Sequence, residues 1–349
     1  MDVQPTLAIV CMLLCHFVIF TSSPGPGHSW LFFFSNHIVG DFAAASFLFL
    51  SGMSQVFSAG KVAATPEAQR SQRIKTLSRG VWIIVFGMIL YSLLDGPTGA
   101  ISWDILTLIG FATLVLFALR RMPSTALVAL CVVIYLVTPW LRGYTDFLSH
   151  WGGQLKAVPE VSDYFKDILV DPVADYQPVW SLPQIVLGFL LVGFFPVFPW
   201  IVFPVMGYVV GREVAGNRFA RVYPFVLGAG VVLIALGLGD AFASVPVSGD
   251  SPVDDYIAPL CFYPNSFGML PLQLGITLVE FAVLWRIFDG RAAAGEGKEG
   301  FLLAYCRRFG RYSLSVYAIH LMILFWGMAL AGRIHEWRTG EALSYYENA

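Results

Sequence analysis

The sequence predicts an all-α polytopic membrane protein with about nine transmembrane helices, one of them broken or re-entrant around residues 184–211. Two observations support this fold class. Of the 349 residues, 57% are hydrophobic and 13% are charged, whereas soluble domains carry about 25% charged residues. The hydrophobic residues also form runs close to the ~20 residues that a helix needs to cross a bilayer. Most of the chain is therefore expected to lie in lipid.

The predicted spans follow these hydrophobic runs. They cover residues 6–24, 40–58, 80–95, 104–119, 124–141, 184–211, 223–243, 269–288 and 312–332. The first run has no basic leader and no small-residue cleavage site, which predicts a retained helix rather than a signal peptide. The run 184–211 is longer than one span needs and contains Phe195-Pro196 and Phe198-Pro199. Broken backbone at membrane depth is tolerated only against protein or a water-filled cavity, so this run is expected to line a cavity.

The charges between the spans predict how the chain is oriented. Lys and Arg collect in alternate connecting loops: Lys61, Arg70, Arg73, Lys75 and Arg79; Arg120 and Arg121; Arg212, Arg218 and Arg221; and Arg291, Lys298, Arg307, Arg308 and Arg311. The loops 25–39, 96–103 and 244–268 contain neither residue type, and the long loop 142–183 has three basic residues but six acidic ones as well. Because basic loops stay in the cytoplasm, the N-terminus is predicted to be cytoplasmic and the C-terminus to lie outside a plasma or inner cell membrane.

Residues 1–349 are predicted to form a single membrane-embedded domain, since no internal repeat is visible and Gly290–Gly300 is a short linker. A net charge of −2 argues against a nucleic-acid partner and leaves membrane lipid as the expected surroundings. Cys11 and Cys15 lie in an apolar run, where they are expected to act as small hydrophobic residues. No metal site is predicted. The seventh span is expected to pack closely against another helix through its glycines Gly228, Gly230, Gly237 and Gly239.

Ionisable residues inside the spans are costly in lipid and are therefore candidates for function. His16 and His320 fall near the midplane and could either flank one cavity or hydrogen-bond to each other across two helices. Asp41 opens the second span. Glu280 is expected to be structural, paired with Arg286 or with a neighbouring helix.

Four further residues lie near the predicted outer surface. Trp103 and Asp104 precede the fourth span, where they are expected to act as an interfacial anchor and helix cap or to serve a substrate site. His28 and His37 lie in a loop without other charges. The ordinary pKa of histidine, about 6.5, suits proton transfer near neutral pH.

Several motifs, taken in chain order, resemble one family. Asp2 followed by His16 is similar to the opening of membrane-bound acyltransferases, although Pro5 stands where that motif has Arg. Further similar stretches are Phe47–Gly52, Arg79-Gly80 with Gly87, Trp103–Gly110, Phe198–Arg212, Tyr263–Ser266 and Phe309–His320. Together they resemble the bacterial relatives of heparan-α-glucosaminide N-acetyltransferase, a branch of the transmembrane acyltransferases.

The resemblance implies transfer of an acetyl or other short acyl group from cytoplasmic acetyl-CoA to a sugar-like acceptor on the outer side, a carbohydrate or glycolipid. The phosphates of CoA would be bound by cations at the cytoplasmic face. The candidates are Arg73, Lys75, Arg79, Arg307, Arg308 and Arg311. The loop 142–183, rich in carboxylates and aromatic residues, is expected to cover the acceptor site.

The resemblance also implies roles near the outer side. His16 is the first candidate for the base that deprotonates the acceptor, and His28 is the second; either could instead be acylated transiently. Asp41 would orient a histidine. His320 would line the transfer pocket or donate to the oxyanion, beside substrate-binding positions at Trp103, Asp104 and Trp200.

Two other functions remain open. Midplane histidines and a broken helix are also features of transporters, so a transporter or flippase for an amphipathic or lipid-linked substrate is the main alternative. The second is a catalytically silent member of the family, which the residue at Pro5 would explain. Binding of CoA separates both alternatives from the enzyme.

Overall fold

The computed structural model describes residues 3–21, 34–59, 65–145, 147–153, 155–157, 170–172, 174–243, 260–263, 265–289 and 301–340. Eight helices in this part of the chain are long and apolar enough to cross a membrane: Phe34–Ala59, Pro66–Asp95, Pro97–Leu119, Ser124–Gly143, Leu182–Ala215, Phe219–Ala241, Met269–Phe288 and Ser313–Thr339. The first predicted span corresponds to a shorter apolar helix, Val3–Ile19. The prediction of an all-α polytopic membrane protein is confirmed.

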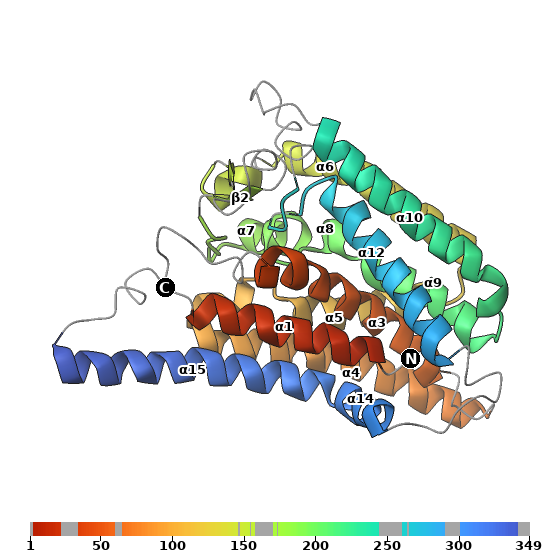
Figure 1. Cartoon of the computed structure of the whole chain (residues 1–349), viewed down its shortest axis with the longest axis horizontal. Helices are drawn as coiled ribbons and strands as arrows, with labels where there is room; N and C mark the ends of the chain where they lie inside the picture. The colour runs from red at the N-terminus through yellow and green to blue at the C-terminus, as the bar shows by residue number, and fades with distance from the viewer. Residues whose placement is uncertain are drawn as a thin grey trace.

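The helices divide as follows in chain order (Figure 1). They are α1 (Val3–Thr21), η1 (Phe34–Gly40), α3 (Asp41–Ala59), α4 (Pro66–Asp95), η2 (Pro97–Ile101), α5 (Ile105–Leu119), α6 (Ser124–Gly143), η3 (Phe147–Trp151), α7 (Leu182–Leu187), η4 (Gly188–Val192), α8 (Val197–Trp200), α9 (Val202–Ala215), α10 (Phe219–Ala243), α12 (Met269–Leu284), η5 (Trp285–Asp289), α14 (Phe301–Arg311) and α15 (Ser313–Thr339). Two short strands, β1 (Leu155–Ala157) and β2 (Val170–Pro172), pair antiparallel.

The start of α4 corrects the sequence prediction. The cations Arg70, Arg73, Lys75 and Arg79 were expected in a loop before a span at 80–95, but α4 already begins at Pro66. Its first turn is stabilised because the Thr65 hydroxyl accepts a hydrogen bond from the Ala68 amide and proline suits the first helical position. Hydropathy detects only the apolar part of a helix, whereas the backbone continues through the polar part.

The prediction of a broken helix at 184–211 is confirmed. α7 and the π-helical η4 end at Gly193, a turn follows, and α8 and α9 resume after Pro196. Phe198 has a non-helical backbone between α8 residues, and the peptide bond between Phe198 and Pro199 is cis. Proline lacks the amide hydrogen that a continuous helix needs, so the interruption follows from the sequence.

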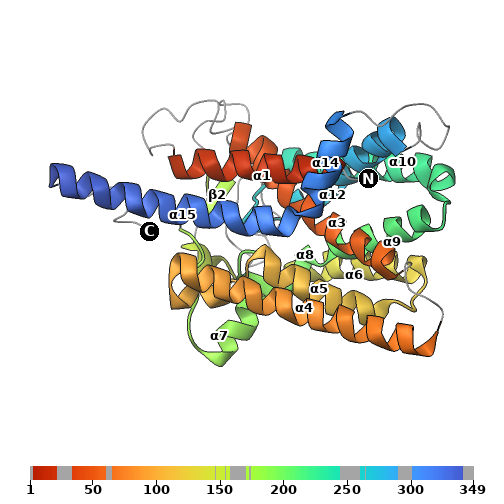
Figure 2. The same cartoon turned by 90° about the horizontal axis from the view of Figure 1, so that it is seen from below.

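α3 lies at the centre of the bundle. It packs against α1, α5, α9 and α12, and its residues Ala45, Leu48 and Phe49 are fully buried. The first and last helices of the chain, α1 and α15, lie side by side, while α4 pairs with α5 and α10 pairs with α12 (Figures 1 and 2). The two ends of the sequence therefore contribute to the same part of the bundle.

Glycines allow the closest helix crossings, as expected where small residues replace a hydrophobic driving force in lipid. A Cβ atom at Gly52 of α3 would overlap the Pro204 backbone of α9, and one at Gly207 would overlap the Phe49 backbone. On α10, a Cβ at Gly230 would lie 2.9 Å from the Gly275 carbonyl oxygen of α12.

Only part of the predicted glycine face on α10 takes part in this packing. Gly230 and Gly237 face α12, where a Cβ at Gly237 would lie 2.6 Å from the Gly268 carbonyl oxygen. Gly228 and Gly239 have open space beside them. Since 3.6 residues make one turn, Gly228 and Gly239 lie on a different face of the helix from Gly230 and Gly237.

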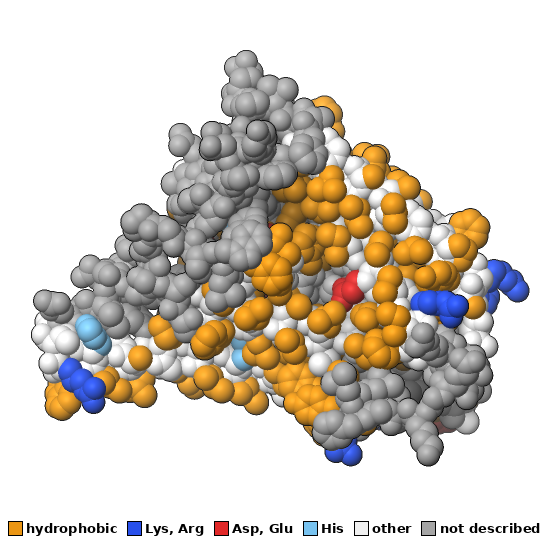
Figure 3. All heavy atoms as spheres, in the orientation of Figure 1, with side chains coloured by type: hydrophobic (Ala, Val, Ile, Leu, Met, Phe, Trp, Pro, Cys, Tyr) orange, Lys and Arg blue, Asp and Glu red, His pale blue; other side chains and the backbone are white. Residues whose placement is uncertain are grey.

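The exterior of the bundle is apolar. Figure 3 shows a broad face of hydrophobic side chains with Lys and Arg at its margins. Exposed examples from separate helices are Trp82, Phe225 and Ile323. Glu280 belongs to α12 but is bound by neighbouring helices rather than by Arg286: Gln4 of α1 and Ser46 of α3 both donate hydrogen bonds to it. Of the two partners expected for Glu280, the structure shows the neighbouring helix.

The glycine contact between α10 and α12 leads to a stability prediction. Gly230→Leu should lower the free energy of unfolding by about 1–3 kcal/mol, because the new side chain meets the backbone and Val279 of α12. Gly228→Leu is the matched control, two residues away and facing open space, and should leave the melting temperature unchanged. Thermal unfolding in detergent measures both. Equal melting temperatures for the two variants would contradict the close crossing.

Candidate active site

Two cavities lined by described residues contain charged side chains. The acidic cavity has a volume of about 410 Å³. Its polar lining residues are His16, Asn36, His37, Asp41, Tyr91, Asp104, Asp175, Tyr263 and Tyr317. The basic cavity has a volume of about 380 Å³. Its polar lining residues are Ser51, Ser54, Gln55, Ser58, Gln72, Lys75, Thr76, Arg79, Thr113 and Ser313. The two cavities thus differ in the sign of their charges.

The same helices line both cavities, at successive turns. On α5, Ile105 lines the acidic cavity and Ile109 lines the basic one. On α15, Tyr317 lines the acidic cavity and Leu314 lines the basic one. One helical turn rises only ~5.4 Å. Phe47 and Tyr317, whose rings stack at 6.2 Å between centroids, form the partition where the cavities approach each other.

Two histidines meet beside this partition. His16 of α1 and His320 of α15 are joined by a 2.8 Å hydrogen bond between His16 Nδ1 and His320 Nε2. Their rings lie 5.2 Å apart and almost parallel. His16 lines the acidic cavity, while His320 lies behind it and its Nδ1 is 3.1 Å from the Val316 carbonyl oxygen. The alternative of a pair bonded across two helices is the one the structure contains.

Asp104 connects the start of α5 to the partition. Its carboxylate accepts a hydrogen bond from the Leu106 amide, as an N-cap residue does. It also accepts the Tyr317 hydroxyl hydrogen, at 2.9 Å from one carboxylate oxygen and 3.1 Å from the other. Asp104 is buried, so these contacts fix both the helix end and the ring of Tyr317.

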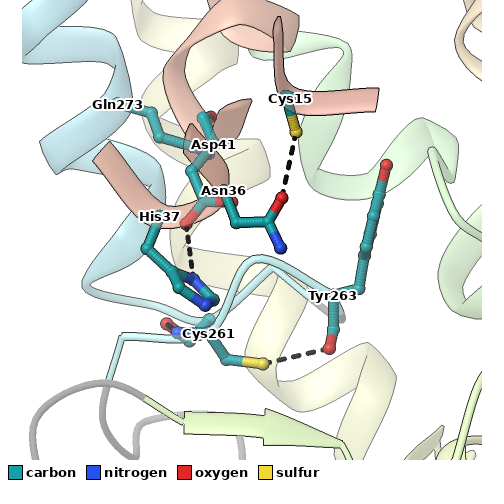
Figure 4. Close-up of polar contacts among 8 residues, drawn as sticks. Cys15, Asn36, His37, Asp41, Cys261, Tyr263 and Gln273 are labelled. Atoms are coloured by element: carbon teal, nitrogen blue, oxygen red, sulfur yellow. Dashed lines mark hydrogen bonds and ion pairs between the residues drawn. The ribbon is translucent and has the colours of Figure 1, made fainter. Parts of the chain in front are cut away.

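A histidine and a carboxylate also lie side by side in the acidic cavity (Figure 4). His37 Nδ1 is 3.5 Å from Asp41 Oδ2, one turn away where η1 continues into α3. The Gln273 amide of α12 donates to the Asp41 backbone carbonyl at 2.7 Å, and Cys15 donates to Asn36 at 3.3 Å. Asp41 therefore lies beside His37, close enough for an ion pair when the imidazole is protonated.

A buried arginine holds the wall of the acidic cavity in place. Arg142, in the last turn of α6, donates hydrogen bonds to the carbonyl oxygens of Leu191, Phe198 and Asn265 at 2.9, 3.2 and 2.8 Å. These carbonyls belong to η4, to α8 and to the segment before α12. Interrupted helices leave carbonyl oxygens without intrahelical partners, and one guanidinium serves three of them.

Two tyrosines at or beside the acidic cavity remain neutral hydroxyls. Tyr263 lines the cavity, and burial raises its pKa well above its ordinary value. Tyr176 follows the lining residue Asp175 in the chain but is buried against Trp151 and Phe194, and burial raises its pKa to about 12. The cavity lining therefore combines the neutral hydroxyl of Tyr263 with the exposed carboxylate of Asp175.

Comparison with known proteins identifies the family of the chain. The family model described as heparan-alpha-glucosaminide N-acetyltransferase, catalytic, matches residues 1–237. The chain belongs to this family. No curated protein and no solved structure matches the chain. It is thus a member of a transmembrane acetyltransferase family, and the matched range contains the residues of the first six predicted spans.

The predicted catalytic and substrate-binding residues of this family member divide into three groups. His16, Asp41 and Asp104 line the acidic cavity, and His320 contacts His16. Trp200 is fully buried among Phe195, Phe203 and Phe262, and Trp103 is buried against Phe189; neither lines a described cavity. His28 lies outside the described residues.

Only some of the predicted cofactor-binding cations line the basic cavity. Lys75 and Arg79 line the basic cavity. Arg73 and Arg308 are exposed and do not line it, although Gly310 of α14 does. The side chains of Arg307 and Arg311 lie outside the described part of the chain.

Sequence reasoning did not single out Asn36 and Tyr91, and it included Tyr263 and Tyr317 only as members of two motifs that resemble the family. A further signal for Tyr317 existed, because it precedes His320 by three residues and therefore shares its helix face. Asn36 had no signal: it lies on η1, and only the folded chain brings it to Cys15 of α1.

The Arg142 contacts predict a large effect of one substitution. Arg142→Met should destabilise the protein by about 3 kcal/mol or more, because three buried carbonyl oxygens lose their donors. Arg212→Met is a control, since it also removes arginine–carbonyl bonds but at the α5–α6 connection, away from both cavities. Thermal unfolding measures stability, and cysteine accessibility of Cys261 reports the segment before α12. Unchanged accessibility in Arg142→Met would contradict its role at the wall.

Proposed function

We propose that this protein transfers an acetyl or other short acyl group from acyl-CoA in the basic cavity to a sugar-like acceptor in the acidic cavity. The observation that carries the proposal is the pair of oppositely charged cavities, which share helices and approach within about one turn at Phe47 and Tyr317. A bonded histidine pair lies next to that point. Membership of the acetyltransferase family supports the reaction class.

The donor end suits CoA. Lys75 and Arg79 supply charges for its phosphates, and the serine, threonine and glutamine side chains deeper in the cavity match the amides of the pantetheine arm. The concentration of basic residues near this end favours its lying in the cytoplasm, with the acidic cavity opening to the other side of a cell membrane.

Pro5 also lines the basic cavity. In the resembling motif an arginine occupies this position, so Pro5 removes one cation from the donor end. Lys75 and Arg79 lie in the lining of the same cavity, and we assign the phosphate contacts to them. The loss at Pro5 therefore weakens donor binding without abolishing it.

In the acidic cavity we assign the base to His16. It removes a proton from the acceptor amine or hydroxyl as the new bond to the acyl carbon forms. The carbon–sulfur bond of the thioester then breaks, and the CoA sulfur leaves with the electron pair and takes up the proton from His16. His37, which lies beside Asp41, and Tyr263 line the cavity in which we place the acceptor hydroxyls.

The paired cavities also favour a second candidate, a transporter for an amphipathic or lipid-linked substrate, because a thin partition between opposed cavities is what alternating access requires. A transporter moves its substrate unchanged. Detection of acylated acceptor together with free CoA therefore excludes transport as the sole activity, and movement of an unmodified substrate in proteoliposomes without acyl transfer excludes the enzyme.

Donor binding gives a direct test. Lys75→Ala and Arg79→Ala should each weaken acetyl-CoA binding about tenfold, as loss of one charge-assisted hydrogen bond does. Pro5→Arg should tighten it. His16→Ala should bind acetyl-CoA normally but lose about 10²–10⁴-fold in transfer rate.

Calorimetry on detergent-solubilised protein measures these affinities, and Arg221→Ala serves as the control because Arg221 is exposed and lines neither cavity. Absence of acetyl-CoA binding by the unmodified protein would contradict the proposed function. Equal weakening by Arg221→Ala would contradict the placement of the donor.

The acceptor should carry no negative charge. Asp41, Asp104 and Asp175 line the acidic cavity, and none of its described lining residues is Lys or Arg. Glucosamine is therefore expected to exceed glucosamine 6-sulfate in kcat/KM by about tenfold or more, because like charges repel in a cavity. Asp175→Asn should narrow this ratio, and Glu67→Gln, exposed at the first turn of α4, should not. A preference for the sulfated sugar would contradict the charge argument.

A further inference from the structure

We propose that His320 is a positioning residue that fixes the tautomer of His16. In this arrangement His16 carries its hydrogen on Nδ1, and its Nε2 presents the lone pair that serves as the base. The catalytic part of this inference rests on the proposed function, whereas the tautomer itself follows from the contacts of the two rings.

The chain of hydrogen bonds starts at a backbone carbonyl. The Val316 oxygen can only accept, so the ring nitrogen next to it, His320 Nδ1 at 3.1 Å, carries a hydrogen. A neutral imidazole has one hydrogen, which leaves His320 Nε2 as an acceptor. The 2.8 Å contact between His320 Nε2 and His16 Nδ1 then needs its hydrogen on His16.

The surroundings hold His320 in this orientation. The Tyr317 ring meets it edge to face at 5.5 Å between centroids, and Tyr317 is itself held by Asp104. The planes of the two imidazoles are almost parallel, and the rings meet edge to edge through the bond between them. Rotation of the His320 ring would break the bond to Val316 and the bond to His16 together.

This arrangement has a chemical consequence for acyl transfer. When His16 Nε2 takes the acceptor proton, the ring becomes an imidazolium, and its Nδ1–H donates more strongly to His320 Nε2. A neutral histidine thus does for His16 what a carboxylate does in many catalytic histidine pairs: it selects the tautomer and stabilises the charged form. His16 then passes the proton to the CoA sulfur and returns to its starting tautomer.

The tautomer can be observed directly. The chain has six histidines, so ¹⁵N-histidine labelling in lipid nanodiscs gives few ring signals, and His16→Asn assigns the relevant pair. We expect the Nδ1 of His16 to show the shift of a protonated nitrogen and its Nε2 that of an unprotonated one. The reverse pattern in the unmodified protein would overturn the inference.

Two variants separate positioning from packing. His320→Gln keeps a side-chain oxygen that can accept from His16 Nδ1, whereas His320→Phe keeps an aromatic ring and loses the acceptor. We expect the Gln variant to retain transfer within about tenfold and the Phe variant to lose about 100-fold or more. Acetyl-CoA binding should be unchanged in both.

The outcomes of this experiment are distinct from failure of the proposed function. Protonated Nδ1 on His16 in a protein that does not transfer acyl groups would leave the tautomer inference standing and remove its catalytic part. Equal activity of the Gln and Phe variants would overturn positioning by His320. If the Phe variant does not fold, the Gln variant and the nitrogen shifts of the unmodified protein still decide.

Discussion

The structure depends on one buried cation. Arg142 binds two carbonyl oxygens of a helix that the sequence interrupts and one of the segment before α12, and so ties both segments together where the helix is broken. Immediately beside these carbonyls, the Phe194 and Phe195 amides donate to the Ser102 and Trp103 carbonyls. The broken segment thereby holds the turn that presents Asp104, and Asp104 holds Tyr317. A chain of hydrogen bonds thus runs from Arg142 and the broken segment through Asp104 to Tyr317 at the partition.

The bundle reconciles an apolar exterior with a polar interior. Outward-facing residues of α4, α10 and α15 are hydrophobic and exposed, as lipid contact requires. The carboxylates of Asp41, Asp104 and Glu280 all have neighbours that donate to or pair with them. Since a polar group in lipid is costly without a partner, this matching lets two charged cavities enter one helix bundle from opposite ends. The partition between them is where we propose that the acyl donor and the acceptor meet.

Several features could be read from the sequence because they depend on local chemistry. Hydropathy alone predicted the helical class and the positions of the spans. The two Phe-Pro pairs predicted the broken segment, and Asp104 was recognisable as the cap of α5. Local signals also gave two wrong predictions. The cations from Arg70 to Arg79 were assigned to a loop, although they belong to the first half of α4. Gly228 and Gly239 were grouped with Gly230 and Gly237, although only the latter two face α12.

The sequence by itself determined the solvent, the helices and the reaction family, because composition, periodicity and ordered motifs are properties of the chain in one dimension. Only the tertiary structure decided which polar groups meet. His16 and His320 are 304 residues apart, and Arg142 reaches carbonyls 49, 56 and 123 residues away. Such contacts depend on helix packing in three dimensions. Close crossings at glycine bring α3 against α9 and α10 against α12, and the hydrogen bond between His16 and His320 joins α1 to α15.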